Sequence, residues 1–270
     1  MTSPTLFTDA DNTLWDTDSV FARAQLGMLR SVQRLEGHSR LQCDPLSFVR
    51  EVDQCLAELH HSGLRYPPRL LALGLTQALL GDRPDIVAKR VIRGRGGPRG
   101  DSPPYIDLEE QFLAALRITP ALRLGVRSGL NMLAEARCTV MVVTEASRTA
   151  VNDRLVALGI AGMISRVIEA PKRPELYRRL RKLDRVAAGS FMIGDQLDRD
   201  IAPAKEAGLR TIFFAGGFVP RWSSSVDDIK PDYVVDDFEK AAELVIGGDE
   251  THRDASSYPR RRAAAQNLGA

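Results

Sequence analysis

The sequence is poor in cysteine and histidine, and it arranges neither as a metal or redox site. Its three cysteines, Cys43, Cys55 and Cys138, are odd in number, and no pair has the spacing of a zinc site or a redox motif. We therefore expect reduced thiols, as in a cytosolic protein. No two of the four histidines form a metal-binding pair at helical spacing, so they are interpreted as surface or packing residues.

Long hydrophobic runs and an excess of one charge are also missing. No apolar stretch approaches the roughly 20 residues that a membrane helix needs, and no leader-like segment precedes Thr5. We therefore expect a cytoplasmic protein without a membrane partner. The chain has 37 basic and 35 acidic side chains, a net charge of +2. This balance argues against a nucleic-acid partner.

Short apolar runs, by contrast, recur along the chain and predict buried parallel strands, because they do not alternate with polar residues. The six runs are Thr5–Thr8, Thr139–Val143, Ser165–Ile168, Ser190–Ile193, Arg210–Phe214 and Tyr233–Val235. Helical patterns at Arg148–Leu158, Glu175–Leu183 and Ile201–Ala207 lie between the later runs. This alternation predicts an α/β fold with a doubly wound parallel sheet.

The interval between the first two runs, residues 18–117, has no strand signal and carries apolar residues at helical spacing. The expected helices are Val20–Leu35, Leu46–Leu59, Leu70–Leu80 and Leu108–Leu116. The pattern predicts a helical insert that forms its own small domain, with the sheet core at 1–17 and 118–246. Within the insert, the Arg-, Gly- and Pro-rich residues 93–104 are interpreted as a mobile loop. Residues 247–270 are interpreted as a disordered tail.

Two aspartates follow the first predicted strand directly, in Asp9-Ala10-Asp11-Asn12-Thr13. Ligands bind at the carboxyl ends of strands in an open parallel sheet, and residues two apart in extended backbone point to the same side. Asp9 and Asp11 are therefore expected to address one site, where their repulsion favours a divalent cation. The alternative is that these acids only end a strand and open a turn.

A second acidic motif, from Gly194 to Asp200, follows the fourth predicted strand. Gly194 permits a tight turn. Asp195 and Asp200 lie five residues apart across a strand-to-helix turn, so we expect both carboxylates to converge on one hard cation. Asp198, between them, is interpreted as a helix N-terminal acid that the macrodipole stabilises.

A hydroxyl and a cation accompany these acids. Thr144 ends the second predicted strand just before a helix, where a hydroxyl and free backbone N–H groups can hold an anion. A simple helix cap would give the same pattern. Lys172 precedes the helix expected at Glu175–Leu183, and by itself it is unremarkable.

Together, the four motifs resemble the haloacid dehalogenase (HAD) superfamily in their order: Asp-x-Asp-x-Thr, a strand-end Thr, a Lys, and Gly-Asp-x-x-x-x-Asp. The resemblance covers residues 5–235 and only loosely the insert. It implies a Rossmann-like sheet with a helical cap inserted after the first strand, at residues 18–117. It also implies Mg²⁺-dependent hydrolysis of a small phosphorylated metabolite, such as a sugar phosphate or a nucleotide.

The resemblance also implies residue roles. Asp9 would be the nucleophile and Asp11 the general acid and base, while Thr144 and Lys172 would bind the transferring phosphoryl group. The implied Mg²⁺ ligands are Asp9, the carbonyl of Asp11, Asp195 and Asp200. An acid at position 11 favours phosphoryl transfer, because the dehalogenases that name the superfamily lack one there.

Some positions depart from the common pattern or leave a choice open. Glu145 follows Thr144 where a small or amide residue is more usual, and it would repel anionic substrates unless it pairs with a cation. Arg173 is a rival of its neighbour Lys172 for the cationic role.

Arginines outside the motifs are candidates for binding substrate. Arg93 and Arg95 of the insert are candidates for binding a second anionic group, and Arg221 could touch substrate after the fifth strand. For the insert arginines, a solvated loop is the alternative.

Other functions fit the same motifs. A sugar-phosphate mutase or phosphotransferase would use the same chemistry with another acceptor. A nucleic-acid end phosphatase is disfavoured by the balanced charge and by the large insert, which would shield the site from polymers. A non-enzymatic binding module is disfavoured by the complete acidic set. The sequence leaves the substrate and the oligomeric state open.

Overall fold

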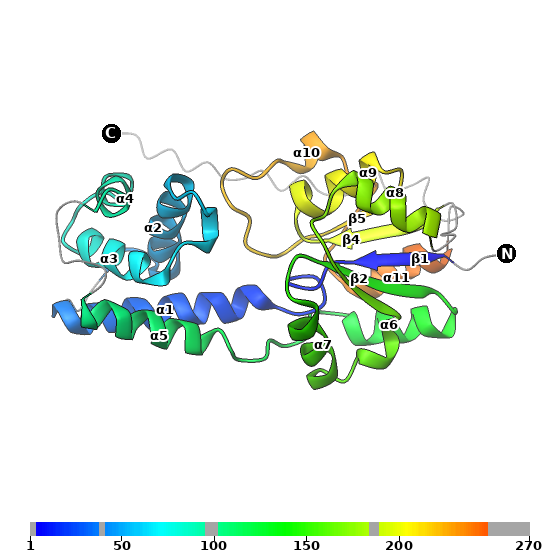
Figure 1. The fold of residues 1–270 in the computed structure, drawn as a ribbon, viewed down its shortest axis with the longest axis horizontal. Helices are drawn as coiled ribbons and strands as arrows, with labels where there is room; N and C mark the ends of the chain where they lie inside the picture. The colour runs from blue at the N-terminus through cyan, green and yellow to red at the C-terminus, as the bar shows by residue number, and fades with distance from the viewer. Residues whose placement is uncertain (1–3, 38–40, 95–101, 184–188, 248–270) are drawn as a thin grey trace.

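The structure is a computed structural model, and it describes residues 4–37, 41–94, 102–183 and 189–247. Two parts are visible: a parallel sheet with helices on both faces, and a group of helices inserted between the first two strands (Figure 1). Residues 95–101 of the interpreted loop, including Arg95, and the interpreted tail apart from Gly247 lie outside the described residues. Pro103 and Pro104, which were predicted to belong to that loop, instead begin a helix, because proline is compatible with a first helical turn.

The sheet has six parallel strands in the order β3-β2-β1-β4-β5-β6. They are β1 (Thr5–Thr8), β2 (Thr139–Thr144), β3 (Arg166–Glu169), β4 (Phe191–Gly194), β5 (Arg210–Phe214) and β6 (Tyr233–Val235). The predicted α/β fold with a doubly wound parallel sheet is confirmed. Each predicted strand is present, and its ends differ from the prediction by no more than one residue.

The central strand β1 is buried on both faces, which is why two apolar residues, Leu6 and Phe7, stand side by side in it rather than alternating with exposed polar ones. Phe7 lies opposite Met141 of β2 and Met192 of β4. Phe7 packs into one hydrophobic cluster and its neighbour Leu6 into the other, because successive side chains of a strand point to opposite faces.

Helices from different parts of the chain cover the two faces. On the face of Leu6 lie α6 (Val126–Glu135), α7 (Arg148–Ala157) and α11 (Phe238–Gly247). On the face of Phe7 lie α8 (Pro174–Leu183) and α9 (Ala202–Glu206). The remaining short elements are η2 (Ala161–Met163), the π-turn η3 (Leu197–Ile201) and α10 (Val226–Ile229).

The helices of the insertion, from α1 to α5, form a hydrophobic core of their own. Its elements are α1 (Thr17–Glu36), α2 (Pro45–Leu59), η1 (Gly63–Arg65), α3 (Pro68–Leu79), α4 (Pro84–Ile92) and α5 (Pro103–Ala115). Local signals fix the helix starts: Asp16 and Asp44 accept hydrogen bonds from backbone N–H groups of the first turns of α1 and α2. Proline occupies the first turn of each of α2 to α5.

The prediction lacked three helices of intermediate length, α4, α6 and α11. Each has only nine or ten residues, so its hydrophobic pattern spans fewer than three turns and is weak in the sequence. No helix within the described ranges is both long and apolar enough to cross a membrane.

The loop after β5 contacts the insertion through side chains. Arg221 of this loop donates two hydrogen bonds to Glu58 of α2, at 2.5 and 2.6 Å, and one to Glu51 at 2.9 Å. The Arg50 guanidinium of α2 lies over the ring of Phe218, 4.6 Å from its centroid. Arg221, a possible substrate contact from the sequence, is thus engaged with two carboxylates of the insertion.

The topology defines one position for a ligand. From β1 the chain continues to β2 on one side of the sheet, and after β3 it crosses to β4 on the other side of β1. A crevice forms at such a switch point, outside the carboxyl ends of the strands. The arrow of β1 points towards the insertion in Figure 1, so the insertion lies at this end of the sheet.

Candidate active site

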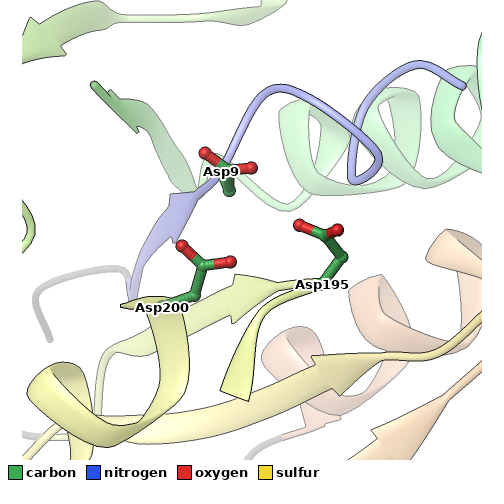
Figure 2. Close-up of side chains that lie close together, drawn as sticks. All are labelled: Asp9, Asp195 and Asp200. Atoms are coloured by element: carbon green, nitrogen blue, oxygen red, sulfur yellow. The ribbon is translucent and has the colours of Figure 1, made fainter. Parts of the chain in front are cut away.

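Three buried carboxylates meet at the switch point. Asp9 follows β1, Asp195 follows β4, and Asp200 lies in the π-turn after β4; their exposed fractions are 6%, 7% and 1%. One carboxylate oxygen of each lies within 4.8 Å of the others. Figure 2 shows the three side chains gathered around one space. The structure thus brings together three of the residues that the sequence predicted as metal ligands.

Backbone geometry sets these positions. The Asp9 N–H donates to the Ile193 carbonyl at 2.9 Å, which ties the ends of β1 and β4 together. The Gln196 N–H donates to Asp200 Oδ2 at 2.9 Å, so the turn holds its own carboxylate. A Cβ atom at Gly194 would lie 2.4 Å from the Asp200 side chain, so glycine is required there for this close approach.

Lys172 lies among the acids. Its Nζ donates hydrogen bonds to Asp9 Oδ1 and to Asp200 Oδ1, the latter at 2.6 Å. The Lys172 side chain is only 6% exposed. Its neighbour Arg173 is exposed. This geometry favours Lys172 over Arg173 for the cationic role.

The excess of buried carboxylates perturbs their proton affinity. Burial raises the pKa of Asp9 to about 7, despite the opposing attraction of Lys172. Burial, and next the charges of Asp200 and Asp9, raise the pKa of Asp195 to about 8. For Lys172, burial acts to lower the pKa, but the carboxylates of Asp9 and Asp200 outweigh it and the pKa is raised. Lys172 is therefore charged at neutral pH.

The cluster fits a divalent cation with oxygen ligands. Asp195 Oδ1 is buried and has no hydrogen-bond partner in the described part of the chain. Such an orphaned oxygen is costly unless a ligand satisfies it. Three carboxylates facing one ammonium also leave an excess of negative charge. Both features match Mg²⁺, which prefers carboxylate oxygens and retains waters.

Asp11 lies beside the cluster and not within it. Its Oδ1 accepts hydrogen bonds from Trp15 Nε1 and Thr17 Oγ1, both at 2.8 Å, and from Arg154 at 3.2 Å. The carboxylate is 40% exposed, so it faces the open side of the site. Sequence reasoning missed Arg154, which lies 143 residues away from Asp11 along the chain. The left-handed backbone of Asn12, with a φ of 56°, turns the chain after Asp11.

A small cavity of about 120 Å³ opens above the acids. Its lining residues include Asp9, Asp11, Thr144 and Lys172, the four predicted catalytic residues. Thr144 is 2% exposed, and its Oγ1 accepts a hydrogen bond from the Ala146 N–H at 3.0 Å, which leaves the hydroxyl hydrogen free for a ligand.

The outer wall of this cavity carries an ion-pair group that the sequence did not reveal. Glu145 accepts a hydrogen bond from Arg199, and its Oε2 lies 4.0 Å from the guanidinium of Arg65 at the end of η1. Arg65 is thus the insertion's contribution to the cavity wall. Arg93 lies at the C-terminus of α4, is exposed, and is not among the lining residues.

A larger cavity, of about 920 Å³, lies between α1 and α5 of the insertion. Apolar residues, arginines, two glutamines and a serine line it, and no carboxylate does among the residues that the structure describes. The chemistry of the acidic cluster therefore belongs to the smaller cavity, despite the difference in volume.

Comparisons with known proteins agree with this fold. Residues 168–241, which contain Lys172, Asp195 and Asp200, match the sequence profile described as HAD-hydrolase-like. No curated protein sequence matches the chain significantly.

Solved structures share the fold over nearly the whole chain. A phosphoglycolate phosphatase predicted in Haemophilus somnus 129PT aligns with a TM-score of 0.58 and 18% identity, over 90% of this chain and 99% of that one. A HAD family hydrolase from Deinococcus radiodurans R1, with bound phosphate and sodium, aligns with a TM-score of 0.59 and 16% identity, over 91% of this chain and 96% of that one. YfnB of Bacillus subtilis, a candidate HAD-hydrolase bound to magnesium, aligns with a TM-score of 0.56 and 19% identity, over 91% of this chain and 99% of that one.

Residues 168–241 thus resemble HAD-like hydrolases, which confirms the predicted resemblance to the haloacid dehalogenase superfamily for this part of the chain. At these low identities the solved structures establish the shared fold. The roles of individual residues and the function of the insertion as a cap stay predictions.

Proposed function

We propose that this protein is a Mg²⁺-dependent phosphomonoester hydrolase that forms an aspartyl-phosphate on Asp9 and acts on a small phosphorylated metabolite. The observation that carries the proposal is the buried group of Asp9, Asp195 and Asp200 around Lys172, with one orphaned oxygen on Asp195. An α/β fold with a HAD-hydrolase-like domain supports it.

In the proposed reaction, Asp9 Oδ attacks phosphorus and the bond from phosphorus to the leaving oxygen breaks. Asp11, protonated, gives its proton to that oxygen. A water molecule then attacks the phosphorus of the aspartyl-phosphate, Asp11 accepts the water proton, and inorganic phosphate and free Asp9 are released. The position of Asp11 on the open side of the cavity suits contact with the leaving group.

The surrounding residues are proposed to bind the metal ion and the phosphoryl oxygens. Asp9, Asp195, Asp200 and the carbonyl of Asp11 are the proposed ligands of Mg²⁺, which would offset the repulsion between the Asp9 carboxylate and the phosphate. Lys172 and Thr144 would hold phosphoryl oxygens, since the ammonium and the free hydroxyl both face the cavity. Asp200 orients Lys172 through their 2.6 Å hydrogen bond.

The insertion, residues 18–117, is the proposed cap, with the catalytic core at 1–17 and 118–246. Arg65 of the insertion lines the cavity, so the insertion contributes to the walls around the leaving group. A cavity of about 120 Å³ is well below the roughly 300–1,000 Å³ of pockets for drug-sized ligands. This size supports a small substrate and disfavours a nucleic-acid end.

The test is phosphate release from a panel of small phosphomonoesters, with Mg²⁺ or with chelator. The wild type is compared with Asp9→Asn and with Asp227→Asn, an exposed carboxylate of α10 that serves as a matched control. We expect release only with Mg²⁺, unchanged in the control and abolished in Asp9→Asn. Release by Asp9→Asn at the wild-type rate would disprove the mechanism. A phosphorylated isomer in place of free phosphate would instead identify a mutase or phosphotransferase.

A further inference from the structure

The rim of the active-site cavity holds a carboxylate between two arginines. Glu145 directly follows Thr144, and its side chain is 28% exposed. Arg199 donates to Glu145 Oε2, and the Arg65 guanidinium lies 4.0 Å from the same oxygen. Arg199 comes from the turn that carries Asp200, and Arg65 comes from the insertion. Both arginines line the cavity together with Glu145.

The geometry points to a substrate whose leaving group carries a carboxylate, bound by Arg65 and Arg199 in place of Glu145. This inference rests on the proposed phosphomonoester hydrolase. Glu145 is then a specificity-determining residue: an internal counter-ion that occupies the arginines until a substrate carboxylate displaces it.

Charge supports an anionic group at this position. Two guanidinium groups face the single carboxylate of Glu145, so this group of three side chains keeps an excess of positive charge. The other exposed acid of the lining, Asp11, is paired with Arg154. Lys172 already contacts Asp9 and Asp200, and it belongs to the phosphoryl end of the cavity. The arginines are thus the cations available to the leaving group within the part of the cavity lining that the structure describes.

Exposure makes the displacement feasible. The Arg65 side chain is 74% exposed and that of Arg199 is 49% exposed. Ion pairs between exposed groups are weak, because water solvates both partners. A substrate already held at its phosphoryl group would therefore compete effectively with Glu145 for the guanidinium groups.

Geometry favours a carboxylate as the second group. The guanidinium fork matches a carboxylate in two parallel hydrogen bonds. The rim already accommodates a carboxylate, that of Glu145. The cavity volume of about 120 Å³ limits the spacer between the phosphate ester and this carboxylate to a few atoms.

The experiment compares two probes that differ in one charge, 3-(phosphonooxy)propanoate and its amide, 3-(phosphonooxy)propanamide. The kcat/KM ratio of acid to amide is measured for the full chain with Mg²⁺, for Arg65→Gln, Arg199→Gln and Glu145→Gln. Arg83→Gln is the control, because Arg83 is a 78% exposed arginine of the insertion outside the cavity. We expect the wild type and the control to prefer the acid by about tenfold, as for a hydrogen bond to a charged group.

Each variant has a distinct expected shift. Arg65→Gln and Arg199→Gln should each reduce the acid preference several-fold, because kcat/KM falls more for the acid than for the amide. Glu145→Gln should increase the preference, because it frees both arginines. In the wild type, added salt should reduce the preference, since the contact is exposed. An acid-to-amide ratio that is the same in the wild type and in Arg65→Gln would overturn the inference.

A binding measurement separates this inference from the proposed function. Dissociation constants of both probes are measured with Asp9→Asn, alone and combined with Arg65→Gln. Tighter binding of the acid that depends on Arg65 supports the inference, even if no protein releases phosphate. Equal affinity for acid and amide in Asp9→Asn overturns it, even if the wild type hydrolyses other phosphomonoesters.

Discussion

Asp195 is the most informative residue to change, because its carboxylate opposes folding without metal and would be needed with it. Its Oδ1 has no partner, and Asp9 and Asp200 crowd the same buried space. Asparagine has the shape of a protonated aspartate and carries no charge. We therefore expect Asp195→Asn to be more stable than the wild type when metal is absent, and less stable than the wild type when Mg²⁺ is saturating.

The pKa sets the size and the pH range of this effect. Burial raises the pKa of Asp195 from 3.8 to about 8, so the folded protein holds this proton more tightly than the unfolded chain. The unfolded state then binds fewer protons than the folded state between these values, and metal-free stability falls as pH rises from about 4 to about 8. Each pH unit in this window costs about 1.4 kcal/mol. Between pH 5 and pH 7.5 the stability lost through Asp195 is therefore up to about 3 kcal/mol.

The assay is thermal or denaturant unfolding of both proteins in chelator at pH 5 and pH 7.5, and again with Mg²⁺. In chelator, the advantage of Asp195→Asn should be small at pH 5 and larger at pH 7.5, by up to about 3 kcal/mol. Mg²⁺ at 1,000 times its Kd should add about 4.1 kcal/mol to the wild type, which exceeds the advantage of the variant, and it should add much less to the variant. An advantage of Asp195→Asn that does not change with pH or with Mg²⁺ would refute the reasoning.

Three further changes test other parts of the site. Gly194→Ala places a Cβ 2.4 Å from the Asp200 side chain, so this variant should lose the thermal stabilisation by Mg²⁺. Gly162→Ala, which has open space around the new Cβ, should keep that stabilisation. Equal Mg²⁺ responses of the two variants would contradict the close approach. Thr144→Val removes the hydroxyl that faces the cavity and should lower kcat by about 10²–10³ with unchanged Mg²⁺ binding, measured by steady-state kinetics and calorimetry; an unchanged kcat would remove Thr144 from the reaction. Arg221→Gln breaks the exposed ion pairs with α2 and should lower the free energy of unfolding by no more than about 1 kcal/mol. Hydrogen exchange in residues 215–225 should become faster. Unaltered exchange would show that Arg221 does not hold the loop.

Much of the sheet part could be predicted because its signals are local. A strand buried on both faces carries apolar residues side by side, so Leu6 and Phe7 mark β1 although they pack into different clusters. The acids at the ends of β1 and β4 interrupt those runs abruptly, and parallel topology makes such strand ends meet. The cluster of Asp9, Asp195 and Asp200 follows from these two facts.

The cation partners of the site could not be predicted in the same way. Arg154 contacts Asp11 and Arg199 contacts Glu145, and each pair is separated by more than 50 residues in the chain. Exposed arginines leave no hydrophobic pattern, so nothing in the sequence distinguishes Arg65 from Arg93, which the sequence suggested as a substrate contact. The short helix α4, which carries Arg93 at its C-terminus, was itself absent from the prediction.

By itself, the sequence determined the α/β architecture, the helical stretch between the first two strands and the acids that meet at the switch point. Apolar periodicity and strand-end residues record burial, and burial is a property of each segment. Only the tertiary structure decided that Lys172 rather than Arg173 reaches Asp9, and that Arg65 lies opposite Glu145. Those contacts join side chains from separate elements, and their distances depend on how helices and strands pack, which no local pattern encodes.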